Sequence, residues 1–199
     1  QVLTCPYEFD KARMVAWEMA DQLALDLVGQ RVVTNQLTLT VGYDIDNLRD
    51  LERKKRYKGL VSTDRYGRQI PKHAHGTANL DGYTASSKLI TAAILELFNR
   101  IVDQNLLVRR LNLTANRVVA EDAAPQETAM EQLDLFTNQQ AVQAEKEAQE
   151  AKLARERKLQ QAMLGIKSKF GKNAILKGTN LVDGATAADR NGRIGGHKA

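Results

Sequence analysis

The segment "TNQLTLTVGY", residues 34–43, constrains the fold more than any other stretch of the chain. Leu37, Leu39 and Val41 alternate in it with polar residues (Gln36, Thr38, Thr40). Because successive side chains of a β-strand point to opposite faces, this period of two predicts a strand buried on one face and polar on the other. The rest of the chain must therefore cover the apolar face.

Two amphipathic helices are predicted to provide that cover. Apolar residues recur at spacings of three and four in residues 9–28 and 84–104, as on one face of a helix. Residues 107–115 alternate like a second strand, and residues 1–5 and 72–80 are weaker candidate strands. The predicted order is β-α-β-β-α-β. It describes an α+β fold in which two helices cover one face of a four-stranded, antiparallel-type sheet.

The opposite face of this sheet is predicted to be bare and polar. An antiparallel sheet can expose one face to water. A face of Thr, Gln, Lys, His, Arg and Asn also suits contact with a polyanion. Residues 44–72 are polar and strongly basic, and they predict a long excursion with a short helix and a hairpin.

Four segments are predicted along the chain. Residues 1–119 form the domain, and residues 120–138 form an acidic linker that contains Pro125. Residues 139–171 predict one long charged helix, and residues 172–199 a basic, irregular tail. The helix has an apolar stripe only near its end (Leu159, Ala162, Met163, Ile166, Phe170).

Charge and composition narrow the function classes. The net charge of +5 favours a polyanionic partner. The single cysteine, Cys5, excludes an internal disulfide and fits a reducing cytosol, so we expect a cytoplasmic location. No apolar run is long enough to span a membrane, and the start does not resemble a signal peptide. Gln1 stands where an initiator Met would be, which indicates a fragment of a longer chain.

No grouping typical of catalysis or of metal binding is found in the sequence. His73 and His75 lack the further ligands that a metal site needs. The segment "GIKSKFGKN" (165–173) fails as a phosphate loop. Five residues separate its glycines, and Asn173 replaces the required Ser or Thr. We therefore predict no catalytic residue and no metal ligand in this chain.

Two basic segments are candidate contacts for phosphates. Arg109 and Arg110 begin a strand, where alternation would place them on opposite faces with Arg109 able to reach the rim. The segment "RKKRYK" (53–58) is typical of a nucleic-acid patch, in which Tyr57 could stack on a base. A solvated surface is the alternative for both segments.

Several motifs in matching order resemble the C-terminal part of Y-family translesion DNA polymerases. They are "QVLTCPY", "EMADQLALDLV", "TNQLTLTVGYD", "YKGLVSTDRYGRQIPKHAHGTANLDGYTASSKLI" and "LLVRRLNLTANRV". Residues 1–119 resemble the little-finger domain, most closely that of the bacterial Gram-positive branch, and the segment from Lys169 to Ala199 resembles the tail of that branch.

The resemblance implies that the open sheet face lies along primer–template DNA and grips the backbones of both strands. Thr114 stands where some members carry a further arginine, so that contact is not expected here. Such binding would be independent of sequence and weakened strongly by salt. The DNA-facing residues would be Thr38, Thr40, Lys72, His73, His75, Thr77, Arg109, Arg110 and Asn112.

The resemblance also implies what this chain lacks. The family's catalytic carboxylates, which bind Mg²⁺ and the incoming nucleotide, lie in a palm domain that these 199 residues do not contain. We therefore expect no cofactor and no nucleotidyl transfer in this chain alone. We expect a monomer that serves DNA repair, through bypass of DNA damage in the SOS response.

The segment "QLDLF" (132–136) is similar to the bacterial sliding-clamp-binding peptide: Gln, Leu, any residue, Leu, Phe. Leu133, Leu135 and Phe136 would fill apolar pockets on the clamp, and Gln132 would hydrogen-bond at the pocket rim. The alternative is that these residues form an amphipathic start of the following helix.

Two other functions remain open on the sequence alone. The first is an RNA-binding module on a ferredoxin-like sheet, which would carry aromatic residues on its central strands where this chain has Thr and Gln. The second is a non-enzymatic interaction protein that recruits a partner through the helix of residues 139–170, although that helix has no heptad repeat.

Overall fold

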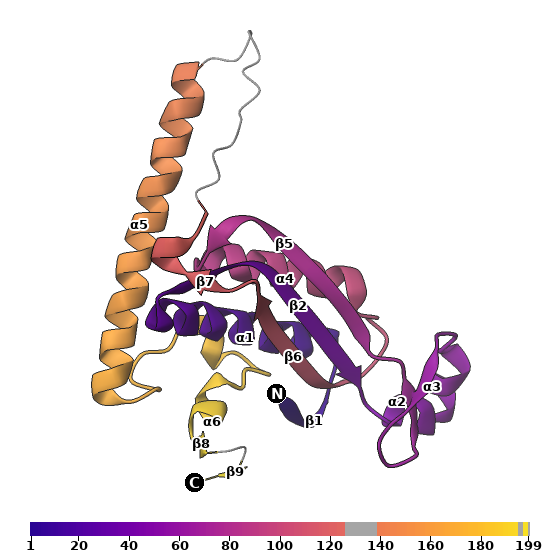
Figure 1. Cartoon of the computed structure of the whole chain (residues 1–199). Helices are drawn as coiled ribbons and strands as arrows, with labels where there is room; N and C mark the ends of the chain where they lie inside the picture. The colour runs from indigo at the N-terminus through magenta and orange to yellow at the C-terminus, as the bar shows by residue number, and fades with distance from the viewer. Residues whose placement is uncertain (126–138, 195–196, 199) are drawn as a thin grey trace.

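The computed structural model, which describes residues 1–125, 139–194 and 197–198, is built around an antiparallel sheet. Its four main strands lie in the order β1-β6-β2-β5, and a short strand, β7, pairs with the start of β2 (Figure 1). This arrangement confirms the predicted α+β fold, to which β7 adds a short fifth strand. The strands are β1 (Val2–Tyr7), β2 (Val32–Tyr43), β5 (Ala74–Thr84), β6 (Val108–Asn116) and β7 (Val119–Ala120).

Helices α1 (Phe9–Gln30) and α4 (Ser87–Ile101) cover one face of the sheet and leave the other open (Figure 1). The residues of β2 that alternation placed inward, Leu37, Leu39 and Val41, are completely buried. A slip of β2 by one residue would exchange its apolar and polar faces, so burial of these three side chains sets the register of the strand.

Gly76 allows α4 to pack closely against β5. A Cβ atom at this position would lie 2.9 Å from Leu97 Cδ1 and 3.0 Å from Ile101 Cγ2. We expect Gly76→Ala to lower the free energy of unfolding by about 1–3 kcal/mol through overpacking, as measured by urea denaturation.

Gly165→Ala is the matched control, because a Cβ there meets no described atom within 4 Å. Gly165 is exposed within a helix, so its replacement should raise stability by about 0.5–1 kcal/mol. Stabilisation by both substitutions would contradict the close packing at Gly76.

Residues 46–73 form a projection beyond one end of the sheet, called the lobe below (Figure 1). It contains the short helix and the hairpin that the sequence predicts. Asn47, which is fully buried, ties the lobe to the sheet: its Nδ2 donates to Leu107 O at 2.9 Å, and its Oδ1 accepts from Leu107 N at 2.8 Å. The elements of the lobe are α2 (Asp46–Arg49), α3 (Leu51–Arg56), β3 (Val61–Thr63) and β4 (Gln69–Pro71).

Helix α5 (Gln139–Phe170) confirms the predicted long helix, but its contact face differs from the predicted stripe. Met163 is buried, whereas Leu159 and Phe170 are 60% and 67% exposed. Polar contacts with the start of α4 set the rotation of the helix instead. Glu156 accepts hydrogen bonds there, and Gln160 Nε2 donates to a backbone carbonyl at 2.9 Å.

The tail after α5 is anchored on α1, so the prediction of an irregular tail is wrong in part. It contains the 3₁₀ helix η2 (Gly178–Leu181), α6 (Ala187–Asn191) and the paired strands β8 (Arg193–Ile194) and β9 (His197–Lys198). Glu18 of α1, only 2% exposed, accepts hydrogen bonds from Asn180 Nδ2 at 3.0 Å, Thr186 N at 2.8 Å and Ala187 N at 3.2 Å. Contacts so distant in sequence leave no local pattern.

Candidate nucleic-acid interface

The open face of the sheet carries three rows of polar side chains, and each row crosses β5, β2 and β6. All of these side chains are exposed or half-buried. We call this set the polar face. Its rows, in the register of the strands, are Asn79–Gln36–Asn116, Thr77–Thr38–Thr114 and His75–Thr40–Asn112.

Hydrogen bonds join side chains of the polar face across the strands. Thr38 Oγ1 accepts from Asn116 Nδ2 at 2.7 Å and lies 3.3 Å from Thr77 Oγ1. Thr40 Oγ1 lies 2.9 Å from His75 Nδ1. Such cross-strand pairs stabilise the sheet and order the side chains before any ligand binds, so less conformational entropy is lost on binding.

Arg110 continues the polar face toward the lobe. Its register partner in β2 is Gly42, two residues after Thr40, so Arg110 lies at the next row position after Asn112. A Cβ atom at Gly42 would lie 3.6 Å from Arg110 Cβ and 3.7 Å from Arg110 Nε, so the arginine side chain runs across the glycine. Arg110 is exposed and presents a cation beside a surface of uncharged hydrogen-bonding groups.

The strict alternation predicted for Arg109 and Arg110 does not hold. Val108 and Leu111 are both completely buried, although two residues lie between them, and the pairing of β6 with β2 shifts register at this point. A β-bulge of this kind redirects a side chain relative to the regular pleat. The two arginines therefore differ in their surroundings in a way that alternation does not describe.

Arg109 lies half-buried and makes contacts within the protein. Its Nη1 donates to the carbonyl of Thr4 in β1 at 3.2 Å, and its Nε lies 3.6 Å from Oδ2 of the buried Asp44. The side chain thus links β1 to the residue that follows β2. Arg110, in contrast, is the more exposed of the pair.

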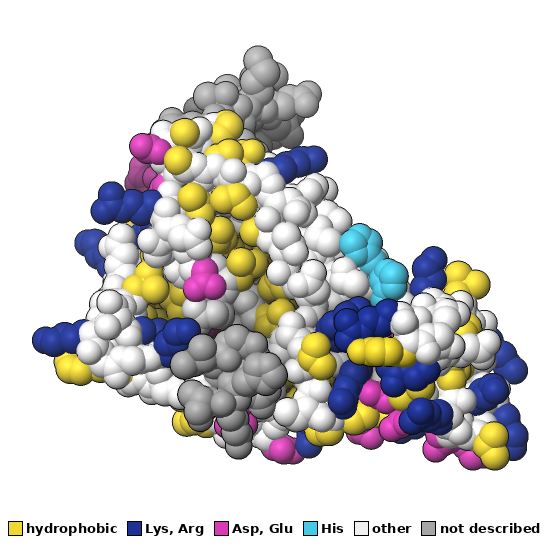
Figure 2. Space-filling model, turned by 60° about the horizontal axis from the view of Figure 1, so that its bottom comes forward, with side chains coloured by type: hydrophobic (Ala, Val, Ile, Leu, Met, Phe, Trp, Pro, Cys, Tyr) yellow, Lys and Arg dark blue, Asp and Glu magenta, His cyan; other side chains and the backbone are white. Residues whose placement is uncertain are grey.

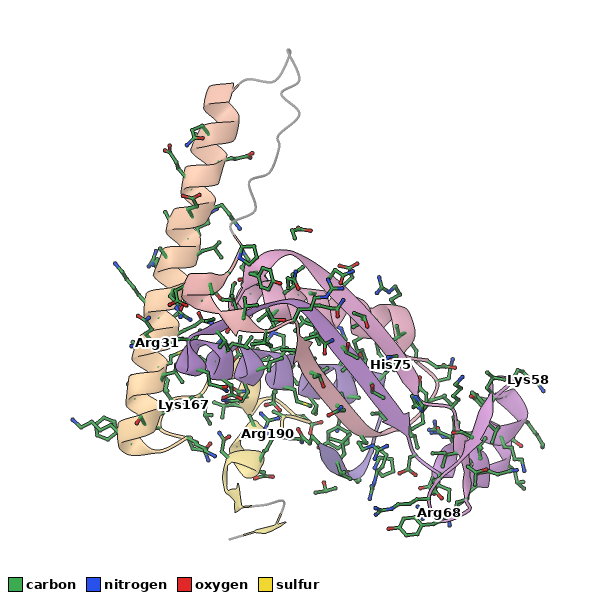
Figure 3. All side chains as sticks on the ribbon, viewed as in Figure 1. Arg31, Lys58, Arg68, His75, Lys167 and Arg190 are labelled. Atoms are coloured by element: carbon green, nitrogen blue, oxygen red, sulfur yellow. The ribbon has the colours of Figure 1, made fainter. Side chains whose placement is uncertain are left out.

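Lys72 and His73 lie where the lobe joins β5. Both are exposed, and the backbone N–H of Lys72 donates to Leu60 O at 2.8 Å, which holds this junction in place. Figure 2 shows histidine side chains beside a group of Lys and Arg side chains, and Figure 3 places His75 on the open side of the sheet. The structure thus brings six of the predicted residues together: Thr38, Thr40, His75, Thr77, Arg110 and Asn112. Lys72 and His73 continue this surface toward the lobe.

The lobe is strongly basic, with 9 Lys and Arg against 4 Asp and Glu in residues 46–73. One of the acidic residues of the lobe, Asp50, has a local structural role. Asp50 caps α3 by accepting hydrogen bonds from the backbone N–H groups of Arg53 and Glu52, and that of Arg53 contributes most to lowering the Asp50 pKa. The Lys and Arg residues of α3 are exposed or half-buried.

Tyr57 stabilises the fold, which argues against the predicted stacking of its ring on a base. Its ring packs against the core, and its hydroxyl donates to Leu60 O at 2.7 Å. Desolvation of the ring and hydroxyl raises the Tyr57 pKa. The basic character of "RKKRYK" did not indicate this, because the ring is covered by residues from outside that segment.

The predicted DNA-facing residues did not include one row of the polar face. Gln36, Asn79 and Asn116 form one of its three rows. Gln36 and Asn79 are joined by a hydrogen bond of 2.9 Å from Gln36 Nε2 to Asn79 Oδ1. The signal was present, because Gln36 and Asn79 lie two residues from the predicted contacts Thr38 and Thr77, and Asn116 lies four residues from Asn112, so all three are on the same side of the pleat.

The predicted clamp-binding residues, Gln132, Leu133, Leu135 and Phe136, lie outside the described residues. Within the described residues, no three His, Cys, Asp or Glu side chains are grouped as metal ligands. No helix in that part of the chain has the length and apolar character needed to cross a membrane.

Residues 5–135 match the family model described as the impB/mucB/samB family C-terminal domain. The chain belongs to this family. The impB/mucB/samB C-terminal domain is the C-terminal region of Y-family DNA polymerases, which supports the predicted resemblance of the sheet and its helices to a little finger. No curated protein matches the chain.

The match to the impB/mucB/samB C-terminal domain takes in strands β2, β5, β6 and β7, the part of β1 from Cys5 onward, both covering helices and the lobe. Helix α5 and the tail lie beyond the matched residues. Both nevertheless pack on α1, which belongs to the matched part. The family domain and its C-terminal additions therefore share a packed surface on α1.

Proposed function

We propose that this chain is the DNA-holding part of a translesion DNA polymerase. The polar face grips primer–template DNA, and residues 132–136 tether the enzyme to the sliding clamp. The observation that supports DNA holding is the in-register set of Thr, Asn, Gln and His side chains with Arg110 at its end. Family membership adds that this domain comes from DNA polymerases.

The chemistry of the polar face suits the DNA backbone more than the bases. Hydroxyl and amide groups can donate to phosphate oxygens, and arginine adds a charge-assisted contact. Such contacts position a protein on the duplex without reading its sequence. A polymerase that must move along any template needs this kind of grip.

The RNA-binding alternative is disfavoured by the central strands. RNA-binding sheets of this kind stack bases on aromatic side chains. Here the exposed positions of the central strands β2 and β6 hold Thr38, Thr40, Asn112 and Thr114. These residues offer hydrogen bonds but no ring on which a base could stack.

Further parts of the proposal rest on the sequence resemblance. The polymerase would belong to the bacterial Gram-positive branch and act as a monomer in the cytoplasm during the response to DNA damage. The chain itself would contribute no catalytic residue and no metal ligand. Mg²⁺ and the nucleotidyl-transfer chemistry would belong to a palm domain elsewhere in the polymerase.

The two arginines of β6 allow a direct test of DNA holding. We expect Arg110→Ala to weaken binding to a blunt DNA duplex and to reduce the slope of log affinity against log salt by about 1 for a lost phosphate contact. Arg109→Ala should weaken binding less, because Arg109 already contacts Thr4 and Asp44. Fluorescence anisotropy over a salt series measures both effects.

Arg109→Ala is also the matched control, since it removes the same charge one residue away. Loss of its partly exposed ion pair should lower stability by about 0.5–1 kcal/mol. If Arg110→Ala leaves duplex affinity and its salt dependence unchanged, the proposed grip is wrong. Tighter binding of single-stranded RNA than of primer–template DNA in competition would favour the RNA-binding alternative instead.

A further inference from the structure

The tip of the lobe hairpin presents an aromatic ring together with two arginines. Tyr66 is 65% exposed, and Arg65 Cζ and Arg68 Cζ lie 4.7 Å and 4.9 Å from the centroid of its ring. No described contact of the hydrophobic core includes this ring. An exposed tyrosine ring outside the hydrophobic core is available for a ligand.

The turn that carries Tyr66 is rigidly built. Gly67 N donates to Asp64 O at 3.0 Å, Asp64 N donates to Arg68 O at 2.9 Å, and Gly67 adopts a left-handed φ of +78°. These features form a tight hairpin loop with Arg65 and Tyr66 at its outermost positions. The side chain of Asp64 also accepts from the backbone N–H groups of Tyr66 and Arg68, at 2.8 and 2.9 Å.

The two arginines differ in whether a carboxylate lies beside them. Arg68 Nη2 lies 2.7 Å from Asp64 Oδ2, and the hydrogen bond from the Arg68 side chain is the main cause of the lowered Asp64 pKa. Among the described residues, Arg65 forms no salt bridge with a carboxylate. Arg68 therefore holds the turn, while Arg65 keeps a positive charge beside the ring.

The tip is joined to the polar face along the chain through the basic residue Lys72 and through His73. The hairpin leads through Lys72 and His73 into β5, and His75 of that strand lies on the polar face. Figures 1 and 3 show the lobe beyond the end of the sheet, and Figure 3 places Arg68 and Lys58 on it. A strand of DNA that leaves a duplex on the polar face in this direction would meet the tip.

We propose that Tyr66 and Arg65 form a stacking site for an unpaired nucleotide of single-stranded DNA next to the bound duplex. Its location beside a duplex rests on the proposed function, whereas the stacking chemistry rests on the hairpin itself. Bases stack on exposed aromatic rings and on guanidinium planes, largely independently of base identity. The excess of cations in the lobe favours a polyanion over a protein partner.

The experiment compares three DNA probes with the same duplex: a blunt end, a single-stranded overhang, and an overhang of equal length made of abasic nucleotides. The full chain should bind the normal overhang most tightly. Tyr66→Ala should weaken binding of that probe by about fivefold or more, which is the lower range for loss of one stacked base. Binding of the blunt and abasic probes should stay unchanged.

Phe170→Ala is the matched control, because Phe170 is equally exposed, at 67%, and also lies beside a cation, with Lys169 Nζ 5.1 Å from its ring centroid. It should leave all three affinities unchanged, and Tyr66→Trp should retain the overhang preference. An unchanged affinity of Tyr66→Ala for the normal overhang would overturn the stacking site. An equal loss on all three probes would also overturn it, because the tip would then contact the duplex. Failure of the proposed function is seen separately, as weak blunt-duplex binding by the unsubstituted chain.

Discussion

Replacing Leu135 and Phe136 together by alanine is expected to weaken binding to a purified bacterial sliding clamp by about a hundredfold or more. These two residues are two of the three apolar side chains of the peptide "QLDLF", and buried anchors of this kind carry most of the energy of a peptide contact. Isothermal titration calorimetry with the full chain measures the change directly.

The same peptide contains its own control. Asp134 occupies the position at which the clamp-binding pattern accepts any residue, so Asp134→Ala should retain nearly all of the affinity. Duplex DNA binding should be unaffected by either change, because the polar face lies on β5, β2 and β6. Wild-type clamp affinity in the double variant would remove clamp tethering from the proposed function and leave DNA holding intact.

Replacing Glu18 by glutamine is expected to release the tail from α1 and to lower the free energy of unfolding by about 2–4 kcal/mol. The buried carboxylate accepts from the backbone N–H groups of Thr186 and Ala187 and from Asn180 Nδ2. A glutamine amide replaces one accepting oxygen by a group that can only donate, so buried donors of the tail lose their partner. Burial also lowers the Arg190 pKa, which the negative charge of Glu18 opposes.

Limited proteolysis distinguishes tail release from a general loss of stability. In Glu18→Gln, cleavage within residues 177–191 should become rapid while the sheet domain stays protected. Asp26→Asn is the control, because Asp26 is exposed on the same helix and bonds only to Gln22 among the described residues. Equal protection of the tail in both variants would show that Glu18 does not anchor it.

The parts of the fold that the sequence predicted are those with a local period. Alternation in residues 34–43 placed Leu37, Leu39 and Val41 inward, and all three are completely buried. The helical spacing likewise found α1 and α4, although α4 begins at Ser87, three residues later than predicted, because β5 runs to Thr84. An alternating or helical pattern directly records which face is covered.

The candidate site was predictable to the same extent. Alternation identified Thr38, Thr40 and Asn112 of the polar face, whereas the β-bulge beside Arg109 breaks that rule and could not be found from it. Tyr57 looked like an exposed aromatic in a basic segment, yet its ring packs against the core. Residues adjacent in sequence predict neither outcome. Arg109 contacts Asp44 and Thr4, and the Tyr57 ring packs against the core, so both side chains are placed by residues from other elements.

The amino-acid sequence alone predicts a half-buried sheet with one polar face, because the two faces of each strand alternate in polarity over short stretches. The three-dimensional structure was needed to show which polar residues share a row, how α5 is rotated, and where the tail is held on α1. Those features depend on strand register and on contacts such as Glu18 with Thr186, which join residues 168 positions apart. Such contacts form where buried donors and acceptors need partners, and they produce no repeating pattern in the sequence.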